Sequence, residues 1–345
     1  MQAYQLVGWQ QPPELRDVPT PEPGPGEVLV RVGGAGVCHS DLHIMEFPEG
    51  QLPYPLPFTL GHENAGWIEA LGPGVTGWEV GAPVAVYGPW GCARCRTCRS
   101  GEENYCERAA ELAAAGAGLG HDGGMAPFMS VAVRRLVPLG DLDPVQAAPL
   151  TDAGLTPYHA VRRSLPLLVP GSSAVVIGAG GLGHMAVQIL SALAPSRVIA
   201  VDVSEDRLDQ ARRLGAEAGV RAGDTAAAEI LDHTKGRGAE LVLDIVGSDD
   251  TIALGASVVR AKGNLTVVGL GFGTFPWNFF GVPYEASLAT TYWGSVVELM
   301  DVLALAEHGH LRAEVETFPL ERVADAYDRM RRGTLSGRAV ITPAG

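Results

Sequence analysis

A glycine pattern between an apolar run and a helical run constrains this 345-residue chain more than any other feature. The segment VVIGAGGLGHM places Gly178, Gly180 and Gly183 directly after the apolar run 173–178 and before a stretch with helical periodicity. Further apolar runs recur with helical stretches between them, at 197–202, 240–247 and 264–271. Strands that alternate with helices at this spacing predict a parallel sheet with helices on both faces, the doubly wound α/β class.

The same glycines fit a loop that binds the pyrophosphate of a dinucleotide. The first permits a tight turn, the second lets the pyrophosphate approach the backbone, and the third lets the helix pack on the strand. Asp202 ends the next strand, 19 residues past Gly183. Its carboxylate can accept hydrogen bonds from the ribose hydroxyls and would repel a 2′-phosphate, which favours NAD over NADP. A glycine-rich turn in an unrelated α/β fold is the alternative, and the acid at this distance counts against it.

The first 150 residues differ in composition, because closely spaced Gly and Pro residues separate short apolar runs. Residues 27–32 alternate polar and apolar side chains, as a half-buried strand does. This part is therefore predicted to be a β-rich, barrel-like domain. Helical runs near the C-terminus, at 295–309 and 321–333, are predicted to return to it. We expect a catalytic domain of residues 1–153 and 293–345, with a cofactor domain of residues 154–292 inserted.

The charge balance excludes several classes of protein. The chain carries 39 acidic and 25 basic residues, a net charge of −14, whereas nucleic-acid binders need a basic face. No apolar run approaches the roughly 20 residues of a membrane span. The start of the chain lacks the basic region and apolar block of a signal peptide, so we expect a cytoplasmic protein. Because the cytosol keeps thiols reduced, metal ligation is the first explanation for five cysteines.

Four of the cysteines fall close together, at Cys92, Cys95, Cys98 and Cys106. Short loops of this spacing let four thiolates converge on one tetrahedral Zn²⁺, and such a site keeps no open position, so it is predicted to be structural. Arginines that could offset its negative charge lie beside it, at Arg94, Arg96, Arg99 and Arg108. Free buried cysteines, two disulfides or a redox pair are the alternatives, and a redox pair would leave two thiols unexplained.

The fifth cysteine, Cys38, and His62 are candidates for a second metal site. A catalytic zinc needs three protein ligands and an open fourth position. Asp152, at the predicted domain boundary, is the candidate for the third ligand. Alone, each residue has an ordinary interpretation: Cys38 as a small core hydrophobe, His62 as a hydrogen-bonded polar residue and Asp152 as a helix N-cap. Only their combination with the dinucleotide loop predicts a catalytic metal.

Taken in order, PGPGEVLVRVGGAGVCHSD, LGHENAGWIEALGPGV, the four-cysteine lobe, GAGGLG and GRAVITP resemble the zinc-dependent alcohol dehydrogenases of the medium-chain dehydrogenase/reductase family. The resemblance covers the whole chain. It implies a β-rich GroES-like catalytic domain with two zinc sites and a Rossmann NAD-binding domain. The segments VYGPWGC, PLTDAGLTPYHA and YWG carry a narrower likeness to bacterial enzymes that act on secondary and aryl alcohols. An oxidoreductase that interconverts hydrophobic alcohols with ketones or aldehydes, by hydride transfer to and from nicotinamide, is then expected.

The resemblance also implies roles for single residues. Cys38, His62 and Asp152 would bind the catalytic zinc, although many relatives have cysteine in place of the aspartate. Glu63 lies next to this zinc and would exchange with water or with a ligand. Ser40 matches the hydroxyl that takes the substrate proton, and His43 matches the residue that passes the proton to solvent through the cofactor ribose.

Two larger sets complete the implied site. The residues implied to contact the cofactor, with His39 and Arg338 near its pyrophosphate, are His39, Gly178, Gly180, Gly181, Leu182, Gly183, Asp202, Arg207, Val268 and Arg338. The residues implied to line an apolar substrate pocket, each equally well an ordinary core side chain, are Tyr54, Leu119, Phe280, Tyr292 and Trp293.

Other functions remain open at this point. A polyol, amino-alcohol or aldehyde dehydrogenase of the same family would need a pocket with more hydrogen-bonding groups. A catalytically silent protein that binds NAD or zinc would need broken catalytic ligands, and here they are intact. The partners expected are a small alcohol or ketone and further copies of the chain, with a tetramer or a dimer implied by the resemblance and with no nucleic acid or membrane.

Overall fold

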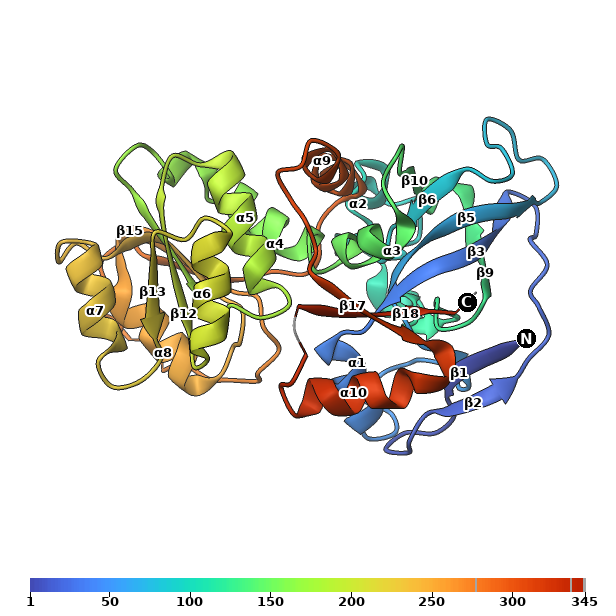
Figure 1. Ribbon diagram of the computed structural model, residues 1–345, viewed down its shortest axis with the longest axis horizontal. Coiled ribbons are helices and arrows are strands. Elements are labelled where there is room, and N and C mark those ends of the chain that lie inside the picture. The colour runs from blue at the N-terminus through green and yellow to red at the C-terminus, as the bar shows by residue number, and fades with distance from the viewer. Residues whose placement is uncertain (277, 336, 344–345) are drawn as a thin grey trace. The chain divides into compact units, whose positions relative to one another are not determined.

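The computed structural model describes residues 1–276, 278–335 and 337–343. These residues form two compact units (Figure 1). Unit 1 comprises Met1–Leu155 and Gly294–Gly345, and unit 2 comprises Thr156–Trp293. Among the described residues, no helix has the length and apolar character needed to cross a bilayer.

Unit 2 is built on one parallel sheet of six strands in the order β13-β12-β11-β14-β15-β16. The strands are β11 (Ser173–Ile177), β12 (Arg197–Asp202), β13 (Ala218–Arg221), β14 (Ala239–Asp244), β15 (Val259–Val267) and β16 (Ser287–Thr290). The central strands β11 and β14 are buried along their whole length, as the continuous apolar runs predict. The sequence did not indicate β13 or the exposed edge strand β16, because both are short and neither forms an apolar run.

Helix α4 (Leu155–Arg162) precedes the first of these strands. The helices that connect the strands are α5 (Gly183–Leu193), α6 (Glu205–Arg213), α7 (Ala226–His233) and α8 (Asp249–Val258). Helices α5 and α6 lie side by side over β11–β13, and α7 and α8 contact each other over β13–β15 (Figure 1). Because crossovers are right-handed, the reversal of strand order between β11 and β14 puts these two pairs on opposite faces. The predicted doubly wound class is confirmed.

The main sheet of unit 1 follows the path β10-β6-β5-β3-β18-β17, with β9 also paired to β3. Its strands are β3 (Glu27–Gly36), β5 (Glu63–Leu71), β6 (Pro83–Val86), β9 (Phe128–Ala132), β10 (Leu136–Pro138), β17 (Val315–Pro319) and β18 (Arg338–Thr342). Smaller sheets contain β1 (Gln2–Leu6), β2 (Glu14–Asp17), β4 (Phe58–Thr59), β7 (Gly116–Ala117) and β8 (Gly120–His121). The β-rich prediction for this part is confirmed.

Strand β3 differs from the expected half-buried strand, because eight of its ten residues are buried. Helix α3 (Pro144–Ala147) and the 3-10 turn η4 (Ala148–Thr151) cover one face of β3 and β5. Gly34 permits this close packing, since a Cβ at that position would lie 3.0 Å from the Cα of Val145. The covering segment leads directly to Asp152, so the close packing also positions a candidate ligand.

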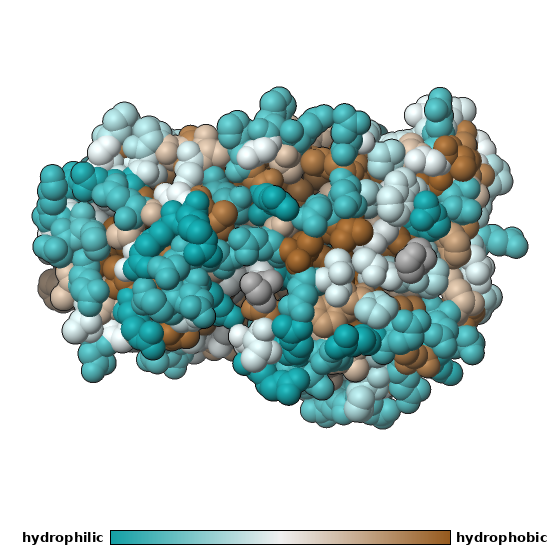
Figure 2. Space-filling model, in the orientation of Figure 1, coloured by the Kyte–Doolittle hydropathy of each residue, from teal (hydrophilic) through white to brown (hydrophobic). Residues whose placement is uncertain are grey.

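The remaining helices of unit 1 are α1 (His39–Glu46), α2 (Arg96–Arg99), α9 (Val296–Glu307) and α10 (Val323–Arg331). The other 3-10 turns are η1 (Glu103–Tyr105), η2 (Ala109–Glu111), η3 (Val133–Arg135), η5 (Leu165–Leu167, in unit 2) and η6 (Leu320–Arg322). Helices α9 and α10 form where the C-terminal periodicity predicts them. Hydrophilic side chains cover the outer face of α6 in unit 2 (Figure 2), as its alternating charges predict.

Candidate functional site

Four side chains of unit 1 converge on one point: Cys38, His62, Glu63 and Asp152. One ligand atom from each lies within 4.8 Å of the others. Cys38 precedes α1, His62 and Glu63 stand at the start of β5, and Asp152 follows η4. The turns that enter and leave the main sheet therefore assemble the cluster from segments that are up to 114 residues apart in the sequence.

The three predicted zinc ligands lie close together. His62 Nε2 is 3.5 Å from Asp152 Oδ2, and Cys38 Sγ is 3.8 Å from the same oxygen. Asp152 ends a 3-10 turn with φ of −134°, so the structure does not support the alternative that it caps the N-terminus of a helix. Sulfur, imidazole nitrogen and carboxylate oxygen are the donors that zinc takes in proteins. The donor set therefore fits a zinc ion.

Asp41 supports this cluster, and the sequence analysis missed it. Its Oδ1 lies 2.9 Å from His62 Nδ1, and its Oδ2 accepts the main-chain N–H of Cys38 at 3.1 Å. A proton held on Nδ1 leaves the Nε2 lone pair directed at the cluster, which is how metal-binding histidines are fixed. The available signal was its position at N3 of α1, where an acidic residue completes a capping box with Cys38.

The electrostatics of the cluster also suit a cation. Burial works to lower the pKa of His62, but Asp41, Asp152 and Cys38 outweigh it and hold that pKa well above its usual value. One buried imidazole thus faces two carboxyl groups and a thiol. A divalent cation would supply positive charge that the protein groups lack.

Glu63 lies beside the cluster in a fully buried position. One carboxylate oxygen is ion-paired with Arg338, and the other, Oε2, has no hydrogen-bond partner among the described residues. A Cβ at Gly36 would collide with that oxygen, so glycine is required there. Burial raises the pKa of Glu63 to about 7, against the opposing effect of Arg338.

Arg338, which the resemblance implies to lie near the cofactor pyrophosphate, contacts a residue of the cluster. It is only 3% exposed, and its guanidinium donates to Glu63 within unit 1. Its charge is therefore already paired inside the metal cluster. Its predicted contact with the pyrophosphate stays a prediction.

Helix α1 carries the residues predicted to move the proton. Ser40 Oγ lies 3.3 Å from His62 Nε2, so its hydroxyl reaches the cluster. His43 is half-buried and follows Ser40 by three residues, which puts both on one face of the helix. His39, at the first position of α1, is exposed.

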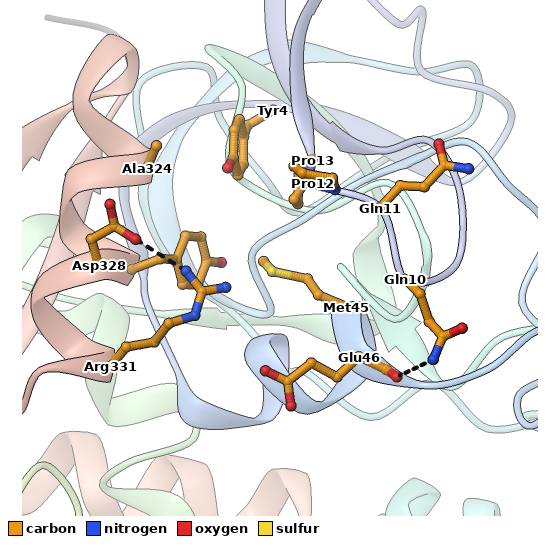
Figure 3. Close-up of a pocket in the computed structure, with 11 residues that line it drawn as sticks. Tyr4, Gln10, Gln11, Pro12, Pro13, Met45, Glu46, Ala324, Asp328 and Arg331 are labelled. Atoms are coloured by element: carbon orange, nitrogen blue, oxygen red, sulfur yellow. Dashed lines mark hydrogen bonds and ion pairs between the residues drawn. The ribbon is translucent and has the colours of Figure 1, made fainter.

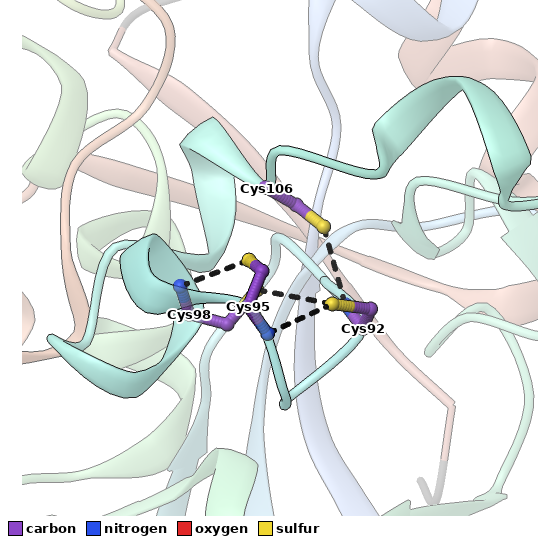
Figure 4. Close-up of side chains that lie close together, drawn as sticks. All are labelled: Cys92, Cys95, Cys98 and Cys106. Carbon is purple, nitrogen blue, oxygen red and sulfur yellow. Dashed lines mark hydrogen bonds between the residues drawn. The ribbon is translucent and has the colours of Figure 1, made fainter.

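The four remaining cysteines form the second cluster (Figure 4). All five cysteines are free thiols, which excludes the two-disulfide alternative in this structure. Cys92 Sγ and Cys98 Sγ are 4.0 Å apart, and Cys95 N donates to Cys92 Sγ at 3.4 Å. Four sulfurs at this spacing fit a structural zinc.

Main-chain N–H groups already favour thiolates in this second cluster. The N–H groups of Arg94 and Cys95 lower the pKa of the Cys92 thiol to about 6. Cys98 differs, because burial raises its pKa. Arg108, one of the four arginines predicted to offset the negative charge of this cluster, donates its main-chain N–H to Cys106 Sγ at 3.4 Å.

The glycine loop of unit 2 has the geometry that its pattern predicts. Gly178 has a φ of +92°, which other residues rarely adopt, and a Cβ at Gly183 would collide with the Gly178 carbonyl oxygen. A Cβ at Gly180 would meet only the guanidinium of Arg207, 3.7 Å away, so the backbone there is open to a ligand. Gly181 is half-buried, and Leu182 caps α5 without a side-chain bond. The first turn of that helix contains no acidic residue that would repel a phosphate.

Asp202 lies next to this loop. Its Oδ2 accepts the N–H of Ala179 at 2.8 Å, and its Oδ1 accepts the N–H of Ser204 at 2.9 Å. The nearest guanidinium nitrogen of Arg207 is 3.9 Å away. The structure thus brings Asp202 and Arg207 to the glycine loop. Val268 is buried just after β15.

The predicted pocket residues divide between the two units. In unit 1, Tyr54 lies close to the backbone next to Leu119. A Cβ built at the following residue, Gly120, would be 3.0 Å from the Tyr54 ring. In unit 2, Phe280 is 83% exposed and packs against Phe279. Tyr292 and Trp293 contact each other at the end of unit 2, and Trp293 is buried. Neither unit alone brings all five together.

Two family models match the chain. The alcohol dehydrogenase GroES-like domain matches residues 24–141, and the zinc-binding dehydrogenase domain matches residues 181–307. An NAD-dependent alcohol dehydrogenase of Sulfurisphaera tokodaii is 38% identical over 99% of this chain and 100% of its own. A D-arabinose 1-dehydrogenase (NADP(+)) of Saccharolobus solfataricus is 35% identical over 98% and 96%. The crystal structure of the Aeropyrum pernix alcohol dehydrogenase has a TM-score of 0.91, with 37% identity over 99% and 100%.

Proposed function

Because this chain belongs to the zinc-dependent alcohol dehydrogenases of the medium-chain dehydrogenase/reductase family, we propose that it transfers hydride between NAD and a hydrophobic secondary or aryl alcohol. The observation that carries the proposal is the convergence of Cys38, His62 and Asp152 within 4.8 Å. Zinc bound there would lower the pKa of an alcohol oxygen, and NAD would accept the hydride. The four-cysteine cluster would hold a second, structural zinc.

The protein's own residues would position and move the proton. The Ser40 hydroxyl, 3.3 Å from His62 Nε2, is placed to accept the proton of a substrate hydroxyl. His43, half-buried one helical turn further on, would pass that proton toward solvent. Asp41 keeps the Nδ1 proton of His62 in place. The burial of Cys38, His62 and Glu63 would exclude water from the reacting oxygen.

The contacts of Asp202 support NAD rather than NADP as the cofactor. Its carboxylate stands beside the loop backbone at Ala179, where it would repel a 2′-phosphate. Arg207 lies close enough to attract that phosphate if the aspartate were absent. This matters because one relative, the D-arabinose 1-dehydrogenase, is named for NADP(+).

The substrate class can be tested with a panel of alcohols. Tyr54 and Leu119 favour an apolar substrate, because burial of an aromatic or branched group contributes about 1.5–3 kcal/mol. We expect kcat/KM with NAD to be about 10- to 100-fold higher for 1-phenylethanol than for D-arabinose. Equal or reversed values would favour the polyol-type alternative. No turnover of any alcohol by a protein that holds two zinc ions would favour the silent-protein alternative.

We also propose that the chain forms at least a dimer, through the edge of the sheet in unit 2. Strand β16 is an edge strand and pairs only with β15 among the described residues. Phe279, Phe280 and Tyr284 precede it in the chain and are all mainly exposed, and Phe279 contacts both of the other rings. A sheet edge with apolar side chains beside it is a typical surface for pairing with a second copy.

Light scattering tests this surface. The double variant Phe279→Asp/Phe280→Asp should lower the molar mass of the assembly at micromolar concentration, because two charges would be placed in the interface. Val80→Asp is the matched control, since Val80 is an exposed apolar residue of unit 1. An unchanged mass for the double variant, or a monomeric unaltered chain, would contradict the proposed interface.

We infer a cytoplasmic location from the state of the thiols. Five free cysteines are needed as zinc ligands in the two clusters. An oxidising compartment would convert neighbouring thiols to disulfides, whereas the cytosol keeps them reduced.

A further inference from the structure

The C-terminal segment reaches the catalytic metal cluster through Tyr327. This residue lies in α10, and its hydroxyl donates to Asp41 Oδ2 at 2.8 Å across 286 positions of sequence. Tyr327 is 2% exposed and Asp41 is fully buried. A hydrogen bond to a buried carboxylate is among the stronger ones in proteins, and losing one partner leaves the other without compensation.

Asp41 connects two metal ligands through its two oxygens. Oδ1 faces His62 Nδ1, and Oδ2 accepts the N–H of Cys38. Tyr327 is the third donor to this carboxylate among the described residues, and it shares Oδ2 with Cys38. Rotation of the carboxylate would move one oxygen away from Cys38 and the other away from His62. The Tyr327 hydroxyl opposes that rotation.

Two kinds of contact hold the Tyr327 side chain. Its ring stacks on Tyr4 at 6.2 Å between centroids and borders a pocket of about 590 Å³. Tyr4, Met45 and Pro12 also border this pocket (Figure 3). The Tyr327 hydroxyl contacts Asp41 Oδ2 and lies 3.5 Å from Met125 Sδ, and these contacts fix the tip of the side chain.

We propose that Tyr327 is a positioning residue for the catalytic zinc and acts through Asp41 on Cys38 and His62. The proposal rests on the proposed function, since it requires a zinc ion at this cluster. It gives the C-terminal segment a direct part in the site: α10 supplies Tyr327, and the adjacent β18 begins with Arg338, the partner of Glu63. Both contacts are long-range, so the metal geometry depends on correct docking of this segment in unit 1.

The test is zinc affinity in Tyr327→Phe, measured by competition with a chromogenic chelator on the full-length protein. This substitution removes the hydroxyl and keeps the ring. We expect zinc to bind the catalytic cluster about 10-fold more weakly, as is typical when a partner that orients a ligand is lost. Affinity at the four-cysteine cluster should not change. Visible absorption of the Co²⁺-substituted catalytic site should shift as well, because these bands report ligand geometry.

Tyr4→Phe is the matched control, because it removes a hydroxyl from the stacked neighbour without touching Asp41. It should match the unaltered protein in both zinc affinity and cobalt spectrum. If Tyr327→Phe behaved like Tyr4→Phe, or if it weakened both zinc sites equally, the positioning role would be refuted. An unaltered protein that binds only one zinc would instead refute the proposed function, so the two failures are distinguishable.

Discussion

Cys38→Ser is expected to lower kcat for alcohol oxidation by about 10³-fold or more while NAD binding persists. A neutral serine hydroxyl is a poor zinc ligand, and its loss leaves only His62 and Asp152 of the three predicted ligands. The stabilisation that a bound metal gives to developing charge is several kcal/mol, and each 1.36 kcal/mol is a factor of about ten in rate. Steady-state kinetics and calorimetric titration with NAD measure the two effects separately.

The matched control is Cys98→Ser in the four-cysteine cluster. Each variant should lose one of two zinc ions, but the consequences should differ. Loss of a structural metal should lower the Tm of Cys98→Ser by about 5 °C or more, with turnover retained by the folded fraction. Loss of NAD affinity in Cys38→Ser would contradict separate metal and cofactor sites. A Cys98→Ser protein with normal Tm and no turnover would show that the two clusters are wrongly assigned.

Asp202→Ala should move the ratio of kcat/KM values for NAD and NADP by about 100-fold or more toward NADP. Hydrogen bonds from a charged group contribute about 1.5–3 kcal/mol each, so NAD loses affinity when the carboxylate is removed. NADP gains affinity, because the repulsion of its 2′-phosphate is relieved and Arg207 lies beside the vacated position. Parallel kinetics with the two cofactors at subsaturating concentration give the ratio.

Two further variants make this result specific. Asp202→Asn keeps one acceptor for the N–H groups of Ala179 and Ser204, so it separates loss of charge from disruption of the loop. It should shift the ratio in the same direction. Adding Arg207→Ala to Asp202→Ala should remove most of the gain with NADP. A ratio that stays unchanged in all of these variants would exclude Asp202 from the cofactor site.

The sequence predicted features that local backbone chemistry determines. Gly178 requires a positive φ, and Gly183 lies against a neighbouring carbonyl group, so their spacing reports the loop geometry directly. The four cysteines of the second cluster lie within one short segment, and their spacing alone predicts a shared metal. Cys38 and His62 were found because thiol and imidazole groups are chemically distinctive.

Features that depend on tertiary contacts could not be predicted in this way. Asp41 and Tyr327 meet across 286 positions, and neither has a spacing that signals the contact. The same is true of Glu63 and Arg338, whose ion pair joins positions 275 residues apart. The buried face of β3 was misjudged, because the turn that covers it leaves no periodic pattern.

The most direct test of the central claim is anomalous diffraction at the zinc absorption edge from crystals of the full-length protein. We predict two peaks for each chain. One should be bounded by Cys38, His62 and Asp152, and the other by the four cysteines of the second cluster. A peak at the four cysteines alone, with the other three ligands bound to no metal, would contradict the dehydrogenase mechanism.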